Sequence, residues 1–255
     1  MQQDDAIHRW YDDHAHEFAE ADVIELPFVG KSREFQERLN RFKLWAIDHG
    51  GIVDLSGKHV LEFGAGHGRL ALTYPEMASY TGVDYSKNLV ELGNRRLERA
   101  GLAGRAKLMR GDALTFDDQR RYDIVCSLGM MCYFADPVPV VTAMARLVKP
   151  GGSFFFDFRN DSWVYSALRR IKWLLNPPTG GTTYVARRRV LEETLGRLGF
   201  SDIRFIPREF PLLAERHAKS GAQWPLSLSN RLAGSKLAQP FATEAWVFAK
   251  RPVST

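Results

Sequence analysis

Short apolar runs alternate with longer amphipathic patterns through the middle of the chain. The runs HVLEFG, SYTGVDY, AKLMRGD, YDIVCSL and SFFFDF have the length and composition typical of strands. Helical patterns lie among them at about 68–78, 86–100, 115–120 and 137–148. This alternation predicts a parallel sheet with helices on both faces. The continuous hydrophobicity of DIVCSL predicts a central strand that is buried on both sides.

The two ends of the chain are patterned differently. Apolar residues recur at three- and four-residue intervals over 4–20 and 35–47, so we expect residues 1–50 to form a helical cover. After residue 158 we expect a basic helix at 162–175, a turn at NPPTGG, a helix at 185–198 and the strands DIRFI and EAWVFAK.

These patterns predict a single domain over residues 1–255. Residues 57–158 form its core, and 185–207 and 241–251 complete it. The irregular stretches 159–184 and 208–240 are expected to form a lid, because long loops inside a compact domain usually cover a site.

Composition narrows the class of protein. The chain has 255 residues, of which 45% are hydrophobic and 25% charged, and its net charge is only +5. Basic residues are mixed with acids except at LRRIK and RRR, so we expect no nucleic-acid partner. Cys126 and Cys132 are too few for a disulfide framework and lack zinc-site spacing, and no metal is expected.

We expect a cytoplasmic protein, because the sequence shows neither a signal-peptide pattern nor a membrane span. The start MQQDDAIHRWYDD is acidic where a signal peptide is basic, and no window approaches the roughly 18 apolar residues that a membrane span needs.

The stretch VLEFGAGHGRLAL follows the first expected strand and is rich in glycine. Glycine permits positive φ and a close approach of backbone to a ligand, and the helix that follows points free N–H groups at the same place. Asp84 ends the second expected strand, where an acid accepts hydrogen bonds from ribose hydroxyls. Asp112 ends the third, where it and the next N–H could hold an adenine edge. The pattern predicts a nucleotide-like ligand.

Taken together, VLEFGAGHGRLAL, YTGVDYS, MRGDAL, YDIVCSLGMMCYF and MARLVKPGGSFFFDF resemble the class I S-adenosylmethionine-dependent methyltransferase family over about residues 57–158. The resemblance implies a Rossmann-like, mostly parallel sheet of seven strands with the last antiparallel, and S-adenosyl-L-methionine as cofactor. A dehydrogenase is the rival for this fold, but its usual G-x-G-x-x-G loop lacks the leading acid that is present here as E-x-G-x-G-x-G.

The resemblance also implies a set of cofactor contacts. They are Glu62, Gly64, Ala65, Gly66 and Gly68 at the methionine end, Asp84 at the ribose, Tyr85, Asp112 and Ala113 at the adenine, Ser127 and Leu128 near the sulfonium, and Tyr11 from the N-terminal helix.

Methyl transfer needs a positioned nucleophile, a dry pocket and, for an alcohol or ammonium acceptor, a base. His14 and Tyr11 on the first helix and Tyr133 after the fourth strand are candidate catalytic residues, although each also fits plain packing. His67 is interpreted as a solvent-facing or cofactor-packing residue of the loop.

Other features fit an acceptor pocket or the surface. Met130 and Met131 suit an adaptable apolar wall or a core, and Asp157 and Arg159 end the fifth strand on the same rim. RRR at 187–189 is interpreted as a solvated face. The segment WVYSALRRIKWLL fits a lid helix or a contact with lipid.

The sequence therefore predicts an enzyme that methylates an oxygen or nitrogen of a small organic molecule. A lipid- or glycan-linked acceptor, RNA, protein and a non-catalytic cofactor-binding module remain as alternatives. The acceptor and the oligomeric state stay open.

Overall fold

The computed structural model describes residues 9, 11–15, 54–162, 166–167, 170, 184–209, 228, 231–232, 235 and 241–253. The expected helix at 35–47, the NPPTGG turn and most of the two expected lid stretches lie outside these residues, including all of WVYSALRRIKWLL except Ser166, Ala167 and Arg170. Within them, no helix is long and apolar enough to cross a membrane.

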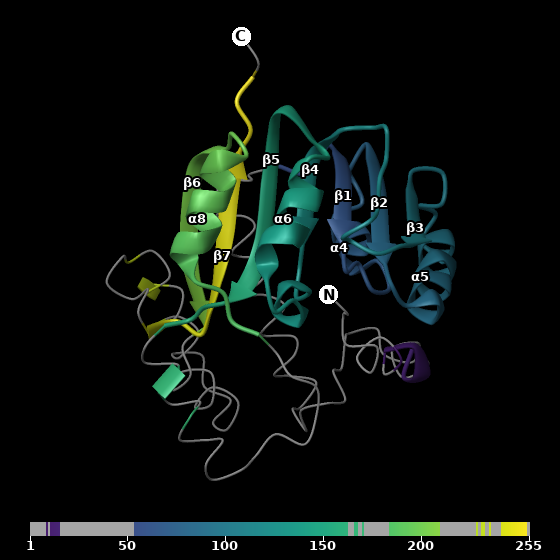
Figure 1. Cartoon of the computed structure of the whole chain (residues 1–255). Coiled ribbons are helices and arrows are strands. Elements are labelled where there is room, and N and C mark those ends of the chain that lie inside the picture. Colours follow the sequence, from purple (N-terminus) through teal and green to yellow (C-terminus); the bar gives the residue numbers. More distant parts are fainter. Residues whose placement is uncertain are drawn as a thin grey trace.

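The described strands form one seven-stranded sheet in the order β3-β2-β1-β4-β5-β7-β6 (Figure 1). They are β1 (His59–Phe63), β2 (Ser79–Asp84), β3 (Ala106–Arg110), β4 (Tyr122–Ser127), β5 (Val148–Arg159), β6 (Ser201–Glu209) and β7 (Glu244–Lys250). Among these strands, only β7 runs antiparallel, to β5 on one side and β6 on the other. The expected mostly parallel sheet with an antiparallel last strand is confirmed.

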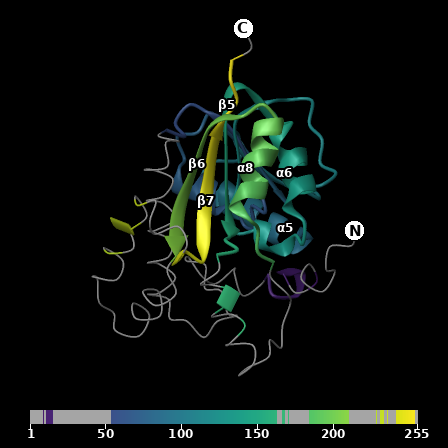
Figure 2. The same ribbon diagram turned by 60° about the vertical axis from the view of Figure 1, so that its left-hand side comes forward.

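Helices cover both faces of the sheet. Helices α6 (Pro137–Ala145) and α8 (Arg188–Arg197) lie side by side over one face (Figures 1 and 2). Phe154 and Phe156 of β5 point into that layer, whereas Phe155 points into the opposite layer, which contains α4 (Arg69–Thr73) and α5 (Lys87–Arg99). The alternation of strand side chains thus divides the core in two.

Two helices that the sequence predicts differ in the structure. The helix expected at 68–78 ends at Thr73, because Tyr74 precedes Pro75 and a residue before proline is disfavoured in helical conformation. The helix expected at 115–120 is absent. The side chain of Asp112 instead accepts the N–H of Leu114, and its backbone carbonyl accepts the N–H groups of Thr115 and Phe116, in a turn. An aspartate side chain that bonds to nearby backbone in this way favours a turn over a helix.

The order of strands along the chain reverses at β1, which pairs with β2 on one side and β4 on the other. In open parallel sheets this reversal opens a crevice at the carboxyl ends of the strands, where ligands bind. The fold therefore places the loops after β1, β2, β3 and β4 around one position.

Candidate active site

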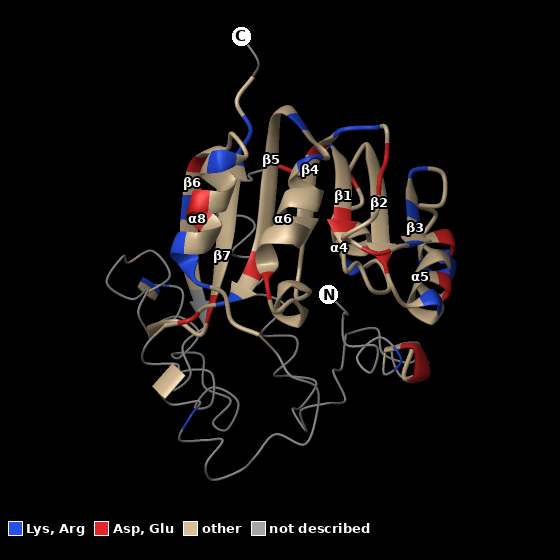
Figure 3. Cartoon of the chain, viewed as in Figure 1, with Lys and Arg blue, Asp and Glu red and all other residues tan. Residues whose placement is uncertain are grey.

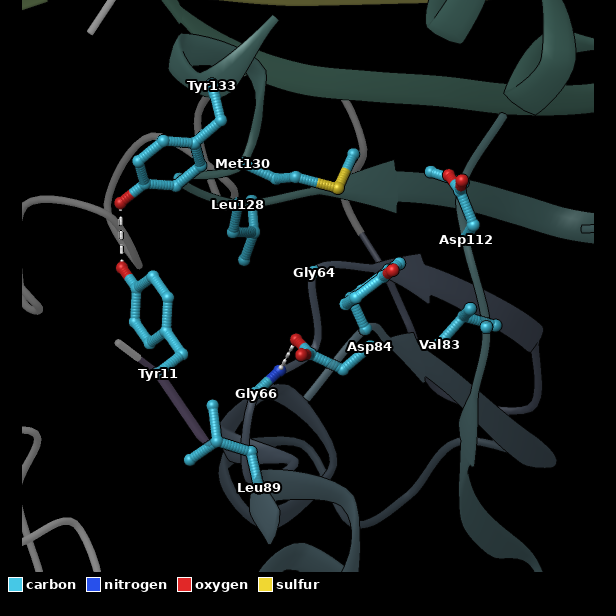
Figure 4. A pocket seen from close by; sticks show the side chains of 14 residues that line it. Tyr11, Gly64, Gly66, Val83, Asp84, Leu89, Asp112, Leu128, Met130 and Tyr133 are labelled. Carbon is cyan, nitrogen blue, oxygen red and sulfur yellow. Dashed lines mark hydrogen bonds between the residues drawn. The ribbon is translucent and has the colours of Figure 1, made fainter. Parts of the chain in front are cut away.

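A pocket lies at this position and draws its wall from loops that are far apart in sequence (Figure 4). Its lining residues are Tyr11, Gly64, Gly66, Val83, Asp84, Tyr85, Leu89, Gly111, Asp112, Ala113, Leu128, Gly129, Met130 and Tyr133. Most of the residues that the sequence predicted for a cofactor are in this set. The motif pattern did not single out Val83, Leu89, Gly111 and Gly129, because their part is set by strand ends and close packing.

The glycine loop brings bare backbone to the pocket wall. Gly64 and Gly66 have φ of +69° and +55°, where side chains are strained. A Cβ at Gly64 would lie 2.7 Å from Cβ of Met130, on the loop after β4. The amides of Gly64 and Ala65 donate to the carbonyl of Val83 at 2.8 and 3.2 Å, so the loop is tied to the end of β2.

Asp84, the last residue of β2, faces the pocket and is held at both carboxylate oxygens. Oδ2 accepts the N–H of Gly66 at 2.7 Å, and Oδ1 accepts the N–H of Ser86 at 2.9 Å (Figure 4). Burial raises the pKa of Asp84, while these two backbone donors oppose the rise. The carboxylate is thereby fixed in place with acceptor capacity left for a ligand, since each oxygen carries more than one lone pair.

Asp112 follows β3 and is the second acid that lines the pocket. Its Oδ1 accepts the N–H of Leu114 at 2.9 Å. A Cβ on the preceding residue, Gly111, would lie 2.9 Å from Cγ1 of Val83, so glycine is needed for this close approach. Tyr85 closes the same side, partly exposed, with the guanidinium of Arg110 5.8 Å from its ring centre.

Glu62 lies behind the pocket and is not part of its wall. It is buried, and Tyr80 Oη on β2 donates to its Oε2 at 2.5 Å. Gly82 pairs with Glu62 across the sheet, and a Cβ there would lie 2.8 Å from the Tyr80 hydroxyl. Ala65, Gly68 and Ser127 also lie outside the lining residues.

Tyr11 and Tyr133 meet across the mouth of the pocket. Their hydroxyls are 2.7 Å apart and their rings pack edge to face, with Tyr133 at the end of the 3-10 helix η2 (Met131–Tyr133) (Figure 4). Burial raises the pKa of both phenols, so both are protonated at neutral pH. They can orient an oxygen or nitrogen by hydrogen bonding, but neither is a base at that pH.

His14, the candidate catalytic histidine, and His67, the histidine of the glycine loop, both lie outside the pocket wall. His14 is half-buried on the N-terminal segment. His67 is buried rather than solvent-facing. Its Nδ1 lies 2.9 Å from Nη1 of Arg96, and because a guanidinium can only donate hydrogen bonds, Nδ1 is the acceptor. Burial, aided by Arg96 and Arg69, lowers the pKa of His67 to about 4. It is therefore neutral at pH 7, with its proton on Nε2.

The loop after β4 is fixed from β5. Asp157, which is buried, accepts the N–H of Gly129 at 2.5 Å. This contact sets the backbone beside Leu128 and Met130, which face the pocket from the side opposite Asp84 (Figure 4).

Comparison with known proteins places the chain in a family. A family model described as a methyltransferase domain matches residues 60–152. The ubiquinone biosynthesis O-methyltransferase of Nitrosospira multiformis is 31% identical over 163 residues, which are 63% of this chain and 67% of that protein. This chain belongs to the class I S-adenosylmethionine-dependent methyltransferase family. Matches to other relatives of the same name span 64% and 46% of their length, so the chain covers about half to two thirds of these relatives.

Solved structures of low identity share the family's fold. Magnesium protoporphyrin IX methyltransferase from Synechocystis PCC 6803 with bound S-adenosylhomocysteine is 15% identical, with a TM-score of 0.63, over 96% of this chain and 98% of that one. The cyclase SpnF is 17% identical, with a TM-score of 0.63, over 97% and 96%. Since SpnF is a cyclase, the fold by itself does not determine the reaction.

The family's methyl donor is S-adenosylmethionine, and the pocket suits it chemically. The donor carries ribose hydroxyls, an adenine with an exocyclic amino group, and a methionine tail. The pocket offers two carboxylates, from the ends of β2 and β3, and a wall of glycine backbone beside them. Carboxylates accept from hydroxyl and amino groups, and bare backbone allows a close approach to the tail.

The three arginines at 187–189 each form an ion pair with an acid at the surface, which agrees with the solvated face expected from the sequence. Arg188 and Arg189 form ion pairs with Glu192 and Glu193 one turn further along α8, and Arg187 pairs with Asp161. Figure 3 shows basic and acidic stretches following one another along α8. These charges already have acidic partners, which favours a solvated face over a phosphate site.

Proposed function

We propose that this protein is an S-adenosylmethionine-dependent methyltransferase that methylates an oxygen of a small organic molecule. The observation that carries the proposal is the pocket at the ends of β1 to β4, where two carboxylates, a glycine backbone and two phenols share one wall. The names of the O-methyltransferase relatives favour oxygen over nitrogen as the methylated atom. When bound, the cofactor supplies an activated methyl group on its sulfonium.

Each part of the wall has a role in this proposal. Asp84 would accept the ribose hydroxyls, and Asp112 with the amide of Ala113 would hold the adenine edge. Gly64 and Gly66 would lie along the methionine tail. Glu62, through its bond from Tyr80 at 2.5 Å, acts from behind by fixing the end of β1 from which the loop departs.

The acceptor would lie on the side of the two tyrosines. Leu128 and Met130 provide an apolar wall that excludes water. The hydroxyls of Tyr11 and Tyr133 bond to each other, and the one that accepts in this bond can donate its own proton to the acceptor oxygen. Because both phenols are protonated, their contribution is orientation and desolvation rather than proton removal. Tyr11 and Tyr133 thus remain our proposed catalytic residues, whereas His14 lies off the pocket wall.

A methyl-transfer assay that separates acceptor classes tests the proposal. The protein is incubated with S-adenosylmethionine labelled in its methyl group and a whole-cell extract, and label is counted in small-molecule, lipid, RNA and protein fractions. We expect label in the small-molecule fraction, reduced by Asp84→Ala. Label confined to RNA or protein would contradict the acceptor class, and binding without label in any fraction would indicate a cofactor-binding module.

We place the protein in the cytoplasm. Cys126 and Cys132 are free thiols, and Cys126 is fully buried. Free thiols suit a reducing compartment.

A further inference from the structure

We infer that Asp12 is a positioning residue that links closure of the N-terminal segment, residues 11–15, to ligand binding at Asp84 through Ser86. The inference rests on the proposed function, because it names how that pocket is closed. It adds a residue that neither the motifs nor the pocket wall contains.

Asp12 docks on the first residues of helix α5. Its Oδ1 accepts the hydroxyl of Ser86 at 2.5 Å and the N–H of Asn88 at 3.2 Å. Its backbone carbonyl accepts the side-chain amide of Asn88 at 2.9 Å. A carboxylate at this end of a helix also interacts favourably with the helix dipole.

Apolar contacts support the same docking. Ala15 packs against Leu89 and Leu92 of α5 in a small separate cluster that Tyr11 also joins. Leu89 in turn lines the pocket. The segment is therefore bound to α5 on both sides of Asp12.

Ser86 connects this docking to the pocket acid. Its N–H donates to Oδ1 of Asp84 at 2.9 Å, while its hydroxyl donates to Asp12. The same hydroxyl oxygen accepts the N–H of Leu89 at 3.2 Å and caps α5. One residue is thus held simultaneously by the acid that faces the ligand and by the acid that anchors the segment.

The residue next to Asp12 is the one that covers the pocket. Tyr11 reaches the hydroxyl of Tyr133 at 2.7 Å, and the docked Asp12 beside it holds the segment where this contact across the mouth is made. The negative charge of Asp12 also lies near enough to contribute to the raised pKa of Asp84. A ligand that donates hydrogen bonds to Asp84 offsets the repulsion between the two acids, and by ordering Asp84 it also orders Ser86, on which Asp12 docks. Both effects favour the docked segment.

Linkage of this kind is reciprocal: if a ligand favours docking, docking must favour the ligand by the same factor. The test uses S-adenosylhomocysteine as the probe, with parent, Asp12→Ala and Asp13→Ala proteins. Asp13 is the matched control, an exposed acid on the same turn. Amide exchange of a peptide covering residues 11–15 and calorimetric affinity are both measured.

We expect the probe to slow exchange of this peptide in the parent. Asp12→Ala should speed its exchange about tenfold without probe and weaken probe affinity by about three- to tenfold, since a charge-assisted hydrogen bond is lost at a partly exposed site. Asp13→Ala should match the parent in both. Asp12→Asn, which keeps an acceptor oxygen, should recover most of the affinity.

The outcomes separate the two proposals. A parent that fails to bind the probe refutes the proposed function, and the linkage with it. If the parent binds the probe and Asp12→Ala binds it equally well, the linkage alone is refuted. The same holds if the parent binds the probe but its 11–15 peptide exchanges at the same rate with and without it. If Asp12→Ala fails to fold, Asp12→Leu, which is close to the acid in size but has no acceptor oxygen, is compared with Asp13→Leu by the same two measurements, and equal values overturn the inference.

Discussion

Tyr80→Phe removes one hydroxyl from the layer behind the glycine loop and leaves the ring in place. In the parent this hydroxyl donates to Oε2 of Glu62 at 2.5 Å, and the two residues are only 2% and 4% exposed. The substitution keeps the shape of the side chain, so the lost interaction dominates its effect. Glu62 loses a donor in a place that water reaches poorly.

The size of the effect follows from this burial. Hydrogen bonds to charged groups contribute about 1.5–3 kcal/mol, and removing one partner leaves the desolvation cost of the other. We expect Tyr80→Phe to lower the free energy of unfolding by about 2–3 kcal/mol. Burial raises the pKa of Tyr80, and the nearby Glu62 carboxylate raises it further. The phenol therefore stays protonated and acts as the donor.

Tyr122→Phe is the matched control. Its ring is equally buried, and its hydroxyl donates to Oδ2 of Asp118 at 2.6 Å. The Asp118 side chain is 19% exposed and also accepts from the N–H of Arg120 at 3.0 Å. Water and Arg120 can replace the lost donor, so the cost should be about 1 kcal/mol or less.

Urea unfolding followed by circular dichroism measures both variants against the parent. The argument that burial of the carboxylate sets the cost is refuted if Tyr80→Phe changes the free energy of unfolding by less than about 0.5 kcal/mol. It is also refuted if Tyr122→Phe lowers the free energy of unfolding as much as Tyr80→Phe does.

Three further predictions concern the loops of the site. The pKa of His67 is about 4 in the folded protein and about 6.5 in the unfolded chain, so between these pH values only the unfolded chain gains a proton. The free energy of unfolding should therefore fall by about 3 kcal/mol as the pH drops through this window. His67→Gln should flatten that slope in urea titrations at each pH, and an unchanged slope would contradict it. Gly64→Ala should cost about 2–4 kcal/mol in the same assay, from its positive φ and the overlap with Met130, and a neutral result would count against this conformation of the loop. Asp157→Ala should release the N–H of Gly129 and cost about 1–3 kcal/mol, whereas parent-like stability would argue against that bond.

The sequence predicts the order of elements well because each polar or glycine motif directly follows an apolar run. Such a run ends where its strand ends, so the pattern of residues alone is enough to assign Asp84 and Asp112 to one edge of the sheet. Helix lengths are harder to predict. The turn around Asp112 and the stop before Pro75 depend on local backbone competition, which weighs little in a periodicity pattern.

Contacts across long sequence separations are not predictable in this way. The bond from Ser86 to Asp12 spans 74 positions, and that between Tyr11 and Tyr133 spans 122. The pair of Glu62 and Tyr80 depends on strand register, and no local signal fixes the register of two parallel strands joined by a helix. These parts of the candidate site follow from tertiary packing.

The central claim is that Asp84 anchors an adenosyl cofactor in this pocket. Calorimetric titration of S-adenosylhomocysteine into the parent and Asp84→Ala proteins tests it most directly, with unfolding curves to show that both are folded. We expect binding to the parent and at least a tenfold weaker affinity for Asp84→Ala, since hydrogen bonds to a charged acceptor contribute about 1.5–3 kcal/mol. Equal affinities for two folded proteins would contradict the account.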